Sequence, residues 1–319
     1  MSITIVIPCH KRPDYLKTVL SSIKNQTALS SVDRIIVSEN SDDSRSKNIC
    51  REFPELCIEY VQQPVEIVGI DHLYWLINQS KSKYTAMIHD DDWWYPTHLE
   101  SALKYLENDD AAAYFSNFVI SDDEVMKNAN FHHPTIWGIF AKNIIDNYVI
   151  SFNFEAVACI SYLITPFHMS GMVANTEYLK YANENGLMNS KPWYADRILY
   201  PYLASKGTIY LNSQTLCAVR RHEGNDQHNY DQLNRYISHL EGSSKIELYA
   251  KENNVNILDV WNKLFLSLPQ KDWQEVLNVY IGNFGYNNPK LPGITKPKQL
   301  GFIKKVIKRG IIKLNDWIG

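Results

Sequence analysis

Three consecutive aspartates, Asp90, Asp91 and Asp92, are the group of side chains in this sequence best suited to chemistry. Carboxylates packed side by side repel one another and raise each other's pKa, a cost that a divalent cation removes. Hard oxygen ligands suit Mg²⁺ or Mn²⁺, and such an ion can neutralise charge that develops on a departing diphosphate. The alternative is an acidic turn that caps the helix expected after Pro96, since Asp favours helix caps. We expect the three carboxylates to be exposed in a loop.

The first third of the chain alternates strand and helix patterns, which places this loop directly after a strand. The patterns predict strands at 3–8, 34–38, 58–62 and 84–89 and helices at 13–26, 44–52 and 70–81. Such alternation predicts a parallel sheet with right-handed crossovers and helices on both faces. Ligands of these sheets bind at the carboxyl ends of the strands. Polar groups follow three of the strands, at 10–12, 39–43 and 90–92, so we expect them to converge on one rim.

After residue 96 the pattern is less regular. It predicts a helix at 97–108, a strand at 111–120, an aromatic-rich region at 131–167, a strand and helix within 171–181, a helix at 196–205 and a strand at 208–212. The chain reads as helical from about residue 229, and a Gly- and Pro-rich stretch at 282–297 resembles a linker. We therefore divide the chain into an α/β domain at 1–228, a helical extension at 229–289, and a linker with a basic tail at 290–319.

Three segments together resemble the family-two glycosyltransferases of the GT-A fold. The segment 5–13, with Leu16 and Gln26, is similar to the family's first strand and helix, and 35–41 is similar to its second strand. Residues 89–96 match one form of its D-x-D motif. The resemblance covers roughly residues 3–225. It implies a Rossmann-like, mostly parallel α/β sheet with flanking helices and a helical C-terminal region. It also implies metal-dependent transfer of a sugar from a nucleotide-diphosphate-sugar, with inversion, onto an acceptor hydroxyl.

The resemblance also implies roles for individual residues in binding the donor. Glu39 stands where the family usually has the Asp that reads the base edge, and His72 lies near a position where some relatives place a basic residue against the diphosphate. Asp90 would contact the ribose or the metal, and Asp91 or Asp92 would hold the metal, Mn²⁺ or Mg²⁺. The full set expected to bind the nucleotide-sugar is Pro8, Cys9, His10, Arg12, Glu39, His72, Asp90, Asp91, Gly171 and Arg220.

Two later segments supply the expected catalytic base and a further metal ligand. An inverting transfer needs a carboxylate that takes the proton from the attacking hydroxyl. Residues 192–197 resemble the family's segment for this role, which makes Asp196 the expected base, although Ala195 replaces the usual preceding Glu. Asp196 is equally suited to cap a helix. In 219–225, similar to the family's R-x-H segment, Arg220 would hold phosphate oxygens and His222 would add a nitrogen ligand to the metal.

Two other function classes remain open at this point. A nucleotidyltransferase on a related sheet also uses paired carboxylates and Mg²⁺, but it needs a Gly-rich loop after the first strand, and 9–13 contains no glycine. A nucleotide- or carbohydrate-binding module that has lost catalysis is the other alternative, and Ala195 is the residue that suggests it. The resemblance favours synthesis of an O-antigen, capsule or other surface glycan, with a UDP-sugar as donor and a glycan or lipid-linked glycan as acceptor.

Composition indicates a globular protein of the cell interior. The hydrophobic content of 45% and charged content of 21% are typical of soluble domains. The five cysteines are odd in number and show no C-x-x-C spacing, which argues against a disulfide framework or a zinc site. Neither a secretory signal nor a transmembrane helix is expected. These features predict a cytoplasmic protein.

The formal charge of −3 is unevenly distributed, because residues 290–319 carry eight Lys or Arg against one acid. This balance argues against general nucleic-acid binding and for a local anionic partner of the tail. Apolar residues between 302 and 318 recur at helical spacing with lysines around them. The tail is therefore expected to be an amphipathic helix. It would either hold the protein at the inner face of an anionic membrane or pack on the acidic body.

Overall fold

The computed structural model describes residues 2–67, 69–122, 149–163, 165, 167–185, 187, 195–222 and 232–260. Among these residues, the side chains of 121, 122, 150, 163, 195, 196, 213, 221 and 232–239 are not described. The linker and the basic tail predicted at 290–319 lie outside the described residues, as does most of the helical extension predicted at 229–289.

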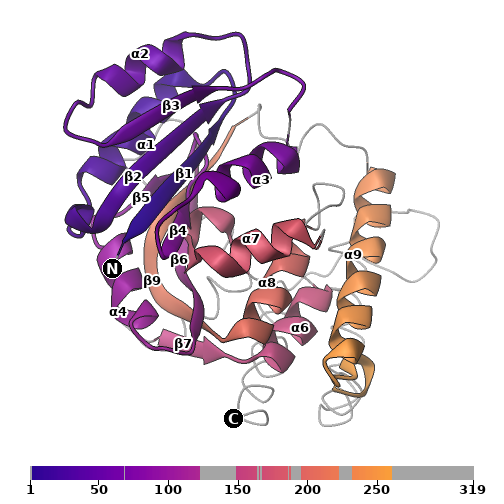
Figure 1. Cartoon of the computed structure of the whole chain (residues 1–319). Coiled ribbons are helices and arrows are strands. Elements are labelled where there is room, and N and C mark those ends of the chain that lie inside the picture. Colours follow the sequence, from indigo (N-terminus) through magenta and orange to yellow (C-terminus); the bar gives the residue numbers. More distant parts are fainter. Residues whose placement is uncertain are drawn as a thin grey trace.

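The first half of the chain is the alternating α/β unit that the sequence predicts (Figure 1). Its elements are β1 (Ile3–Cys9), α1 (Pro13–Lys24), β2 (Val32–Glu39), α2 (Arg45–Arg51), β3 (Ile58–Gln62), α3 (Gly69–Gln79) and β4 (Tyr84–Met87). Strand β1 pairs in parallel with β2 and β4, and β2 pairs in parallel with β3. The predicted parallel sheet is confirmed for these four strands.

Strand β1 and helix α1 show why the sequence folds in this way. Strand β1 is an almost unbroken apolar run, which suits a strand covered by helices on both faces. Pro13 opens α1, since a residue in the first helical turn needs no N–H partner within the helix. The buried residues Leu16, Leu20 and Ile23 recur at helical spacing and form the face of α1 that joins the core.

The second half extends the sheet with both strand directions. Its elements are β5 (Trp93–Trp94), α4 (His98–Leu106), β6 (Ala111–Asp122), β7 (Val149–Phe152), α6 (Phe154–Leu163), β8 (Met172–Asn175), α7 (Thr176–Glu184), α8 (Ala195–Lys206), β9 (Thr208–Arg221) and α9 (Gln232–Glu252). The strand order is β3-β2-β1-β4-β8-β6-β9-β5, with β7 paired to β9. Strand β8 is antiparallel to both β4 and β6, whereas β6 and β9 are parallel.

The sheet separates two hydrophobic cores. Successive side chains of β1 point to opposite faces, so Ile5 and Ile7 join residues of α1, α2 and α4, whereas Val6 joins residues of α3, α6, α7, α8 and α9. In Figure 1, α3 lies near α7 and α8, apart from α2 and α4. None of the described helices combines the length and the apolar character that a membrane span requires.

Several boundaries differ from the sequence-based prediction. Strand β4 ends at Met87 instead of 89, and β9 continues to Arg221 instead of 212. The prediction missed β5, β7 and α6, because β5 has only two residues and the other two lie in a segment where aromatic and aliphatic residues show no clear period. The long β9 matters most, because it carries residues 220 and 221 to the rim where β4 ends.

Candidate active site at the carboxyl edge of the sheet

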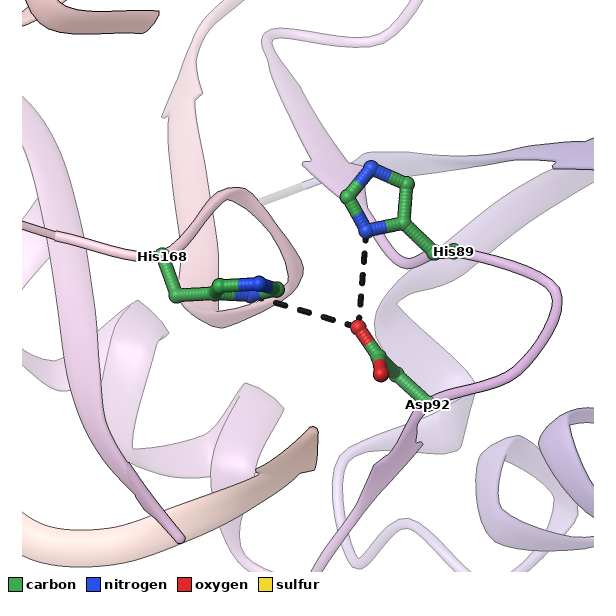
Figure 2. A group of neighbouring side chains, drawn as sticks. All are labelled: His89, Asp92 and His168. Atoms are coloured by element: carbon green, nitrogen blue, oxygen red, sulfur yellow. Dashed lines mark ion pairs between the residues drawn. The ribbon is translucent and has the colours of Figure 1, made fainter. Parts of the chain in front are cut away.

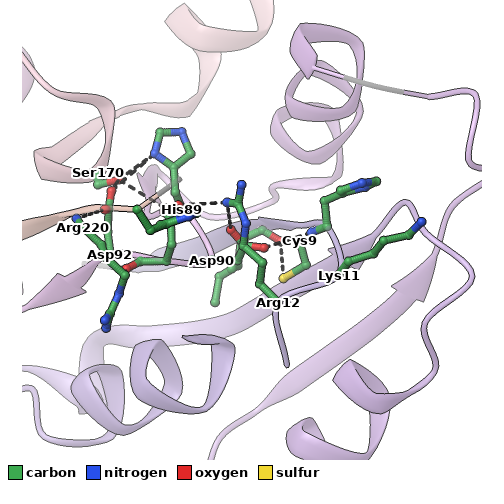
Figure 3. A network of polar contacts seen from close by, with 12 residues as sticks. Cys9, Lys11, Arg12, His89, Asp90, Asp92, Ser170 and Arg220 are labelled. Atoms are coloured by element: carbon green, nitrogen blue, oxygen red, sulfur yellow. Dashed lines mark hydrogen bonds and ion pairs between the residues drawn. The ribbon is translucent and has the colours of Figure 1, made fainter. Parts of the chain in front are cut away.

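The topology brings the ends of three strands to one edge. Because β8 reverses direction between β4 and β6, strands β6 and β9 run in the same direction as β1 and β4. The residues that follow β1, β4 and β9 therefore meet at the carboxyl edge (Figure 3). The polar group after β2 joins them, since Asn40 Oδ1 lies 2.8 Å from His10 Nδ1. The three groups predicted to share one rim do share it.

The turn after β1 holds the first carboxylate of the acidic loop, residues 90–92. The backbone N–H of His10 donates to Asp90 at 2.9 Å, and the Arg12 guanidinium donates to Asp90 at 3.0 Å and to Asp91 at 2.8 Å. Lys11 adopts a φ of 56°, a left-handed conformation that is uncommon for residues other than glycine. In this backbone conformation the His10 N–H donates to Asp90 and the next N–H, that of Lys11, donates to Glu39.

The end of β9 holds the second and third carboxylates. His222 Nε2 lies 3.0 Å from Asp91 Oδ2, on the same oxygen that Arg12 contacts. The Arg220 Nε–H donates to the Asp91 carbonyl at 2.9 Å, and the Arg220 backbone N–H donates to Asp92 Oδ1 at 3.0 Å. The predicted R-x-H segment therefore lies directly against the acidic loop.

The other oxygen of Asp92 faces a group that the sequence did not reveal. Ser170, in the short 3-10 helix Met169–Gly171, donates its hydroxyl to Asp92 Oδ2. His89 Nδ1 lies 3.4 Å and His168 Nδ1 3.9 Å from the same oxygen (Figure 2). The ligand atoms of His89, Asp92 and His168 all lie within 4.8 Å of one another, an arrangement that could hold a metal ion.

The acidic loop is buried, which contradicts the expectation that its carboxylates are exposed. Asp90, Asp91 and Asp92 retain only 3%, 6% and 3% of their surface. Burial and then the neighbouring Asp91 charge raise the pKa of Asp90 to about 7, and burial with the Asp92 charge raises the pKa of Asp91. The carboxylates can be buried because Arg12 and His222 pair with Asp91 and the Arg220 backbone N–H donates to Asp92.

Asp92 differs from its two neighbours. Burial alone would raise its pKa, but the hydrogen bonds from His89 and Ser170 and the charge of His89 keep the pKa of Asp92 below its usual value. Burial opposes protonation of His89, yet its hydrogen bond to Asp92 raises the pKa of His89 to about 9. Burial lowers the pKa of His168 to about 4, so that this imidazole is neutral at physiological pH. Of the three aspartates, Asp92 is therefore the one whose ionised form the protein stabilises most.

Other predicted residues lie further from the acidic loop. The buried Glu39 carboxylate accepts hydrogen bonds from the Lys11 N–H at 3.2 Å, Ser41 at 2.6 Å and Ser46 at 2.7 Å, so its own chain already occupies it. His72 is buried in α3 with Nε2 2.8 Å from Ser38 Oγ, and desolvation lowers its pKa to about 4. At this pKa the imidazole is neutral at physiological pH, and its hydrogen bond in the described structure is to Ser38. Its role beside the diphosphate stays a prediction.

The remaining predicted residues are placed as follows. Pro8 and Cys9 end β1 beside the turn, and Cys9 is buried. Gly171 lies against β6, where a Cβ atom would meet the Ser116 carbonyl oxygen at 3.0 Å, so close packing alone accounts for a glycine there. Asp196 lies in the first turn of α8, and its side chain is outside what the structure describes. Its role as the base stays a prediction.

Sequence reasoning missed His168, Ser170 and Tyr15 at this site. His168 and Ser170 both precede Gly171 by one to three residues, but no spacing linked them to the acidic loop. Tyr15 lies in the first turn of α1, where its ring centre is 5.2 Å from that of His222. An aromatic residue at that position is also typical of a helix packing on a core, and so gave no functional signal.

Comparisons with known proteins identify the family and the fold of the chain. Residues 4–167 match the sequence profile of Glycosyl transferase family 2. Over 232 residues the chain is 26% identical to Glycosyltransferase GlyA of Streptococcus pneumoniae serotype 4. The match covers 70% of this chain but 31% of that protein, so the chain spans about a third of the length of this curated relative.

Two solved structures share the fold at low sequence identity. S. aureus TarS 1–349, in complex with UDP-GlcNAc, superposes with a TM-score of 0.56 at 12% identity, covering 89% of this chain and 80% of that one. The mannosyltransferase PcManGT from Pyrobaculum calidifontis, in complex with GDP-Man and Mn²⁺, gives a TM-score of 0.52 at 12% identity, with 90% and 87% covered. Both likenesses bear on the fold, which is of the GT-A type.

Proposed function

The chain belongs to glycosyl transferase family 2, and on that premise we propose that it is an inverting, metal-dependent glycosyltransferase. Its donor is a nucleotide-diphosphate-sugar, the class of compound that TarS and PcManGT bind as UDP-GlcNAc and GDP-Man, and we propose a UDP-sugar. Its acceptor is a hydroxyl of a glycan or lipid-linked glycan, in O-antigen, capsule or other surface-glycan synthesis. The observation that carries the proposal is the meeting of Arg12, Arg220 and His222 with three buried carboxylates at the edge where ligands of such sheets bind.

The turn after β1 has the properties of a nucleotide site. Pro8 and Cys9 end a buried parallel strand and His10 follows it, and Arg12 places a permanent positive charge beside the acidic loop. Arg220 brings a second guanidinium from the opposite side. Guanidinium groups match the geometry of phosphate oxygens through paired N–H donors, so these two arginines suit a diphosphate. The His10 N–H donates to Asp90, and in our proposal this carboxyl accepts from ribose hydroxyls.

The carboxylates of the acidic loop and the imidazoles beside them fit a divalent cation. Two of its carboxylates have raised pKa values because burial and mutual repulsion are incompletely compensated, and imidazoles stand on both sides of the loop. Asp91, Asp92 and His222 are the ligands that the sequence predicts, and the group of His89, Asp92 and His168 shares Asp92 with them. When bound, Mn²⁺ or Mg²⁺ would neutralise charge on the departing diphosphate.

The chemistry of the protein itself then centres on Asp196. As the acceptor oxygen attacks the anomeric carbon from the face opposite the nucleotide, Asp196 takes the hydroxyl proton. The bond from the anomeric carbon to the phosphate oxygen breaks with its electron pair on the diphosphate. Arg12 and Arg220 stabilise the negative charge on the leaving group. A positioned base of this kind contributes ~10²–10⁴-fold to the rate.

A panel of nucleotide-sugars tests the proposal. Thermal unfolding is followed with each donor, with and without Mn²⁺, because a specific ligand stabilises the folded state in proportion to its affinity. We expect one UDP-sugar to raise the Tm only with Mn²⁺, and the same compound to be hydrolysed slowly. Hydrolysis that is lost in Asp196→Asn supports the transferase. Tight binding with no turnover, with or without glycan acceptors, would instead identify a binding module.

A further inference from the structure

His89 and His168 lie beside Asp92 of the acidic loop and indicate how a cation would be held. The presence of that cation follows from the proposed function. We infer that the divalent cation is bound by His89, Asp92 and His168, and that the two imidazoles make the site selective for Mn²⁺ or Co²⁺ over Mg²⁺. His222, which the sequence predicts as a ligand, then serves to pair with Asp91.

The geometry of the three side chains is close to that of a bound ion. Their ligand atoms lie within 4.8 Å of one another, and Asp92 Oδ2 is 3.4 Å from His89 Nδ1 and 3.9 Å from His168 Nδ1. Ligand atoms at about 2.1 Å from an ion lie about 3–3.4 Å apart. Contraction of the group by up to about 1.4–1.8 Å through side-chain rotation therefore suffices. Figure 2 shows both rings directed toward the Asp92 carboxylate.

Ser170 holds this group in place. Its hydroxyl donates to Asp92 Oδ2 and lies 3.0 Å from His89 Nδ1, and it accepts from the His89 backbone N–H at 3.2 Å. The Ser170 N–H donates to His168 Nδ1 at 3.3 Å, a long bond that an ion would replace. Ser170 is itself fully buried, and its carbonyl accepts from the Trp94 indole N–H. A buried residue that contacts all three ligands is typical of the outer shell of a metal site.

The charges around the loop favour this side over the other. Arg12 lies 2.8 Å from Asp91 Oδ2, the same oxygen that His222 contacts, so a dication placed there would stand against a permanent positive charge. The described contacts of the Asp92 carboxylate are the Ser170 hydroxyl, the Arg220 backbone N–H and the two imidazoles. All of these contacts are neutral once His89 is a metal ligand, so the Asp92 charge is left for the ion.

The ligand types determine the selectivity. Two imidazole nitrogens and one carboxylate oxygen suit divalent transition ions, among which Co²⁺ binds such a site more tightly than Mn²⁺. Mg²⁺ prefers an all-oxygen set and gives up its water reluctantly. PcManGT, which shares the fold, was solved in complex with Mn²⁺.

The test measures Mn²⁺ binding directly, by the loss of the free-ion electron paramagnetic resonance signal, with and without UDP. His168→Phe keeps an aromatic ring against Phe118, whose ring centre is 5.1 Å away, but removes the ligand nitrogens. His222→Phe is the matched control, because its ring packs on Tyr15 in the same manner. We expect His168→Phe to weaken Mn²⁺ binding by at least ~10-fold and His222→Phe to change it by less than ~2-fold.

A second measurement keeps the inference falsifiable if His168→Phe does not fold. Bound Co²⁺ should show absorption bands of a nitrogen-containing site in the wild-type protein, and about a tenfold excess of Mg²⁺ should leave most of the Mn²⁺ bound. Loss of Mn²⁺ binding in His222→Phe but not in His168→Phe would overturn the inference, as would equal binding of Mg²⁺ or no Mn²⁺ binding in either condition. Sugar transfer is assayed separately. Transfer without Mn²⁺ binding refutes the inference alone, and Mn²⁺ binding at His168 without transfer refutes only the proposed activity.

Discussion

The Arg220 guanidinium carbon lies 4.4 Å from the ring centre of Tyr15, so that a side chain of α1 supports the charged end of β9. The same ring contacts the His222 imidazole at a centre-to-centre distance of 5.2 Å. Arg220 and His222, to which the family resemblance gives roles in binding the donor and the metal, thus both contact one aromatic ring near the start of the chain.

Replacement of Tyr15 tests this support. A cation over an aromatic ring contributes about 0.5–2 kcal/mol, so Tyr15→Leu should weaken donor binding by about 2–30-fold. Tyr15→Phe keeps the ring and should bind the donor as the wild type does. Isothermal titration with the best nucleotide-sugar and Mn²⁺ compares the two variants. Equal affinity in Tyr15→Leu would show that Arg220 does not depend on the ring.

The acidic loop allows a prediction that separates binding from folding. Asp91→Asn should weaken metal-dependent donor binding while the fold survives, because it removes one of the mutually repelling buried charges that raise the pKa of Asp91. Loss of the Arg12 partner limits this relief in Asp91→Asn. Asp92→Asn should weaken metal-dependent donor binding as well, and it should also lower stability, because the folded protein stabilises the Asp92 charge. Circular dichroism and donor titration with and without EDTA provide the measurements. If both variants keep full activity in EDTA, the loop does not hold a metal.

Asp196 is tested through the reaction itself. Asp196→Asn should lose ~10²–10⁴-fold in kcat, while donor affinity changes little because the base acts on the acceptor. Asp109→Asn, an exposed aspartate after α4, is the matched control and should retain wild-type turnover. Steady-state transfer rates and donor titrations on both variants decide the question. Wild-type turnover in Asp196→Asn would remove this residue from the mechanism.

His98 makes stability depend on pH in a predictable direction. This imidazole is buried and stacks on Trp94 at 4.5 Å, and within the described structure neither of its nitrogens has a hydrogen-bond partner. Desolvation lowers its pKa to about 3, whereas an unfolded histidine titrates near 6.5. The unfolded state therefore binds the proton first, and the stability present above pH 6.5 is lost as the pH falls toward 3.

His98→Phe should remove this dependence. The phenyl ring keeps the stacking on Trp94 and brings no buried nitrogen, so the variant should be at least as stable as the wild type at pH 7. On lowering the pH to 5, it should lose about 1–2 kcal/mol less of its unfolding free energy than the wild type does. Urea denaturation at the two pH values measures the difference. Parallel losses in both proteins would mean that His98 is not the titrating group.

The basic tail, which lies outside the described residues, is tested with vesicles. An anionic surface attracts each nearby Lys or Arg by about 1 kcal/mol, so the full chain should float with anionic liposomes in a salt-sensitive manner. A protein truncated after Pro297 should not. Neutral liposomes serve as the control. Equal flotation of the two proteins would leave the tail with a role in packing on the acidic body.

The sequence by itself determined the architecture of the first half and the location of the site. Strands and helices follow from the periodicity of neighbouring residues, so β1 to β4 and the helices between them could be predicted within a few residues. Parallel order then places the polar groups after β1, β2 and β4 at one rim, whichever residues fill the core. The motifs at 5–13, 35–41 and 89–96 carried the family membership for the same reason, because each is local in the chain.

Only the tertiary structure decided which side chains touch the acidic loop. Ser170 is 78 residues from Asp92, and His222 is 131 residues from Asp91. Such pairs depend on the reversal of direction at β8 and on the length of β9, neither of which has a local signal. Burial reversed the expectation for the aspartates, because partners distant in sequence cover them. The placement of His168 beside Asp92 follows from the same physical cause, since the packing of the sheet sets the contacts between residues far apart in the chain.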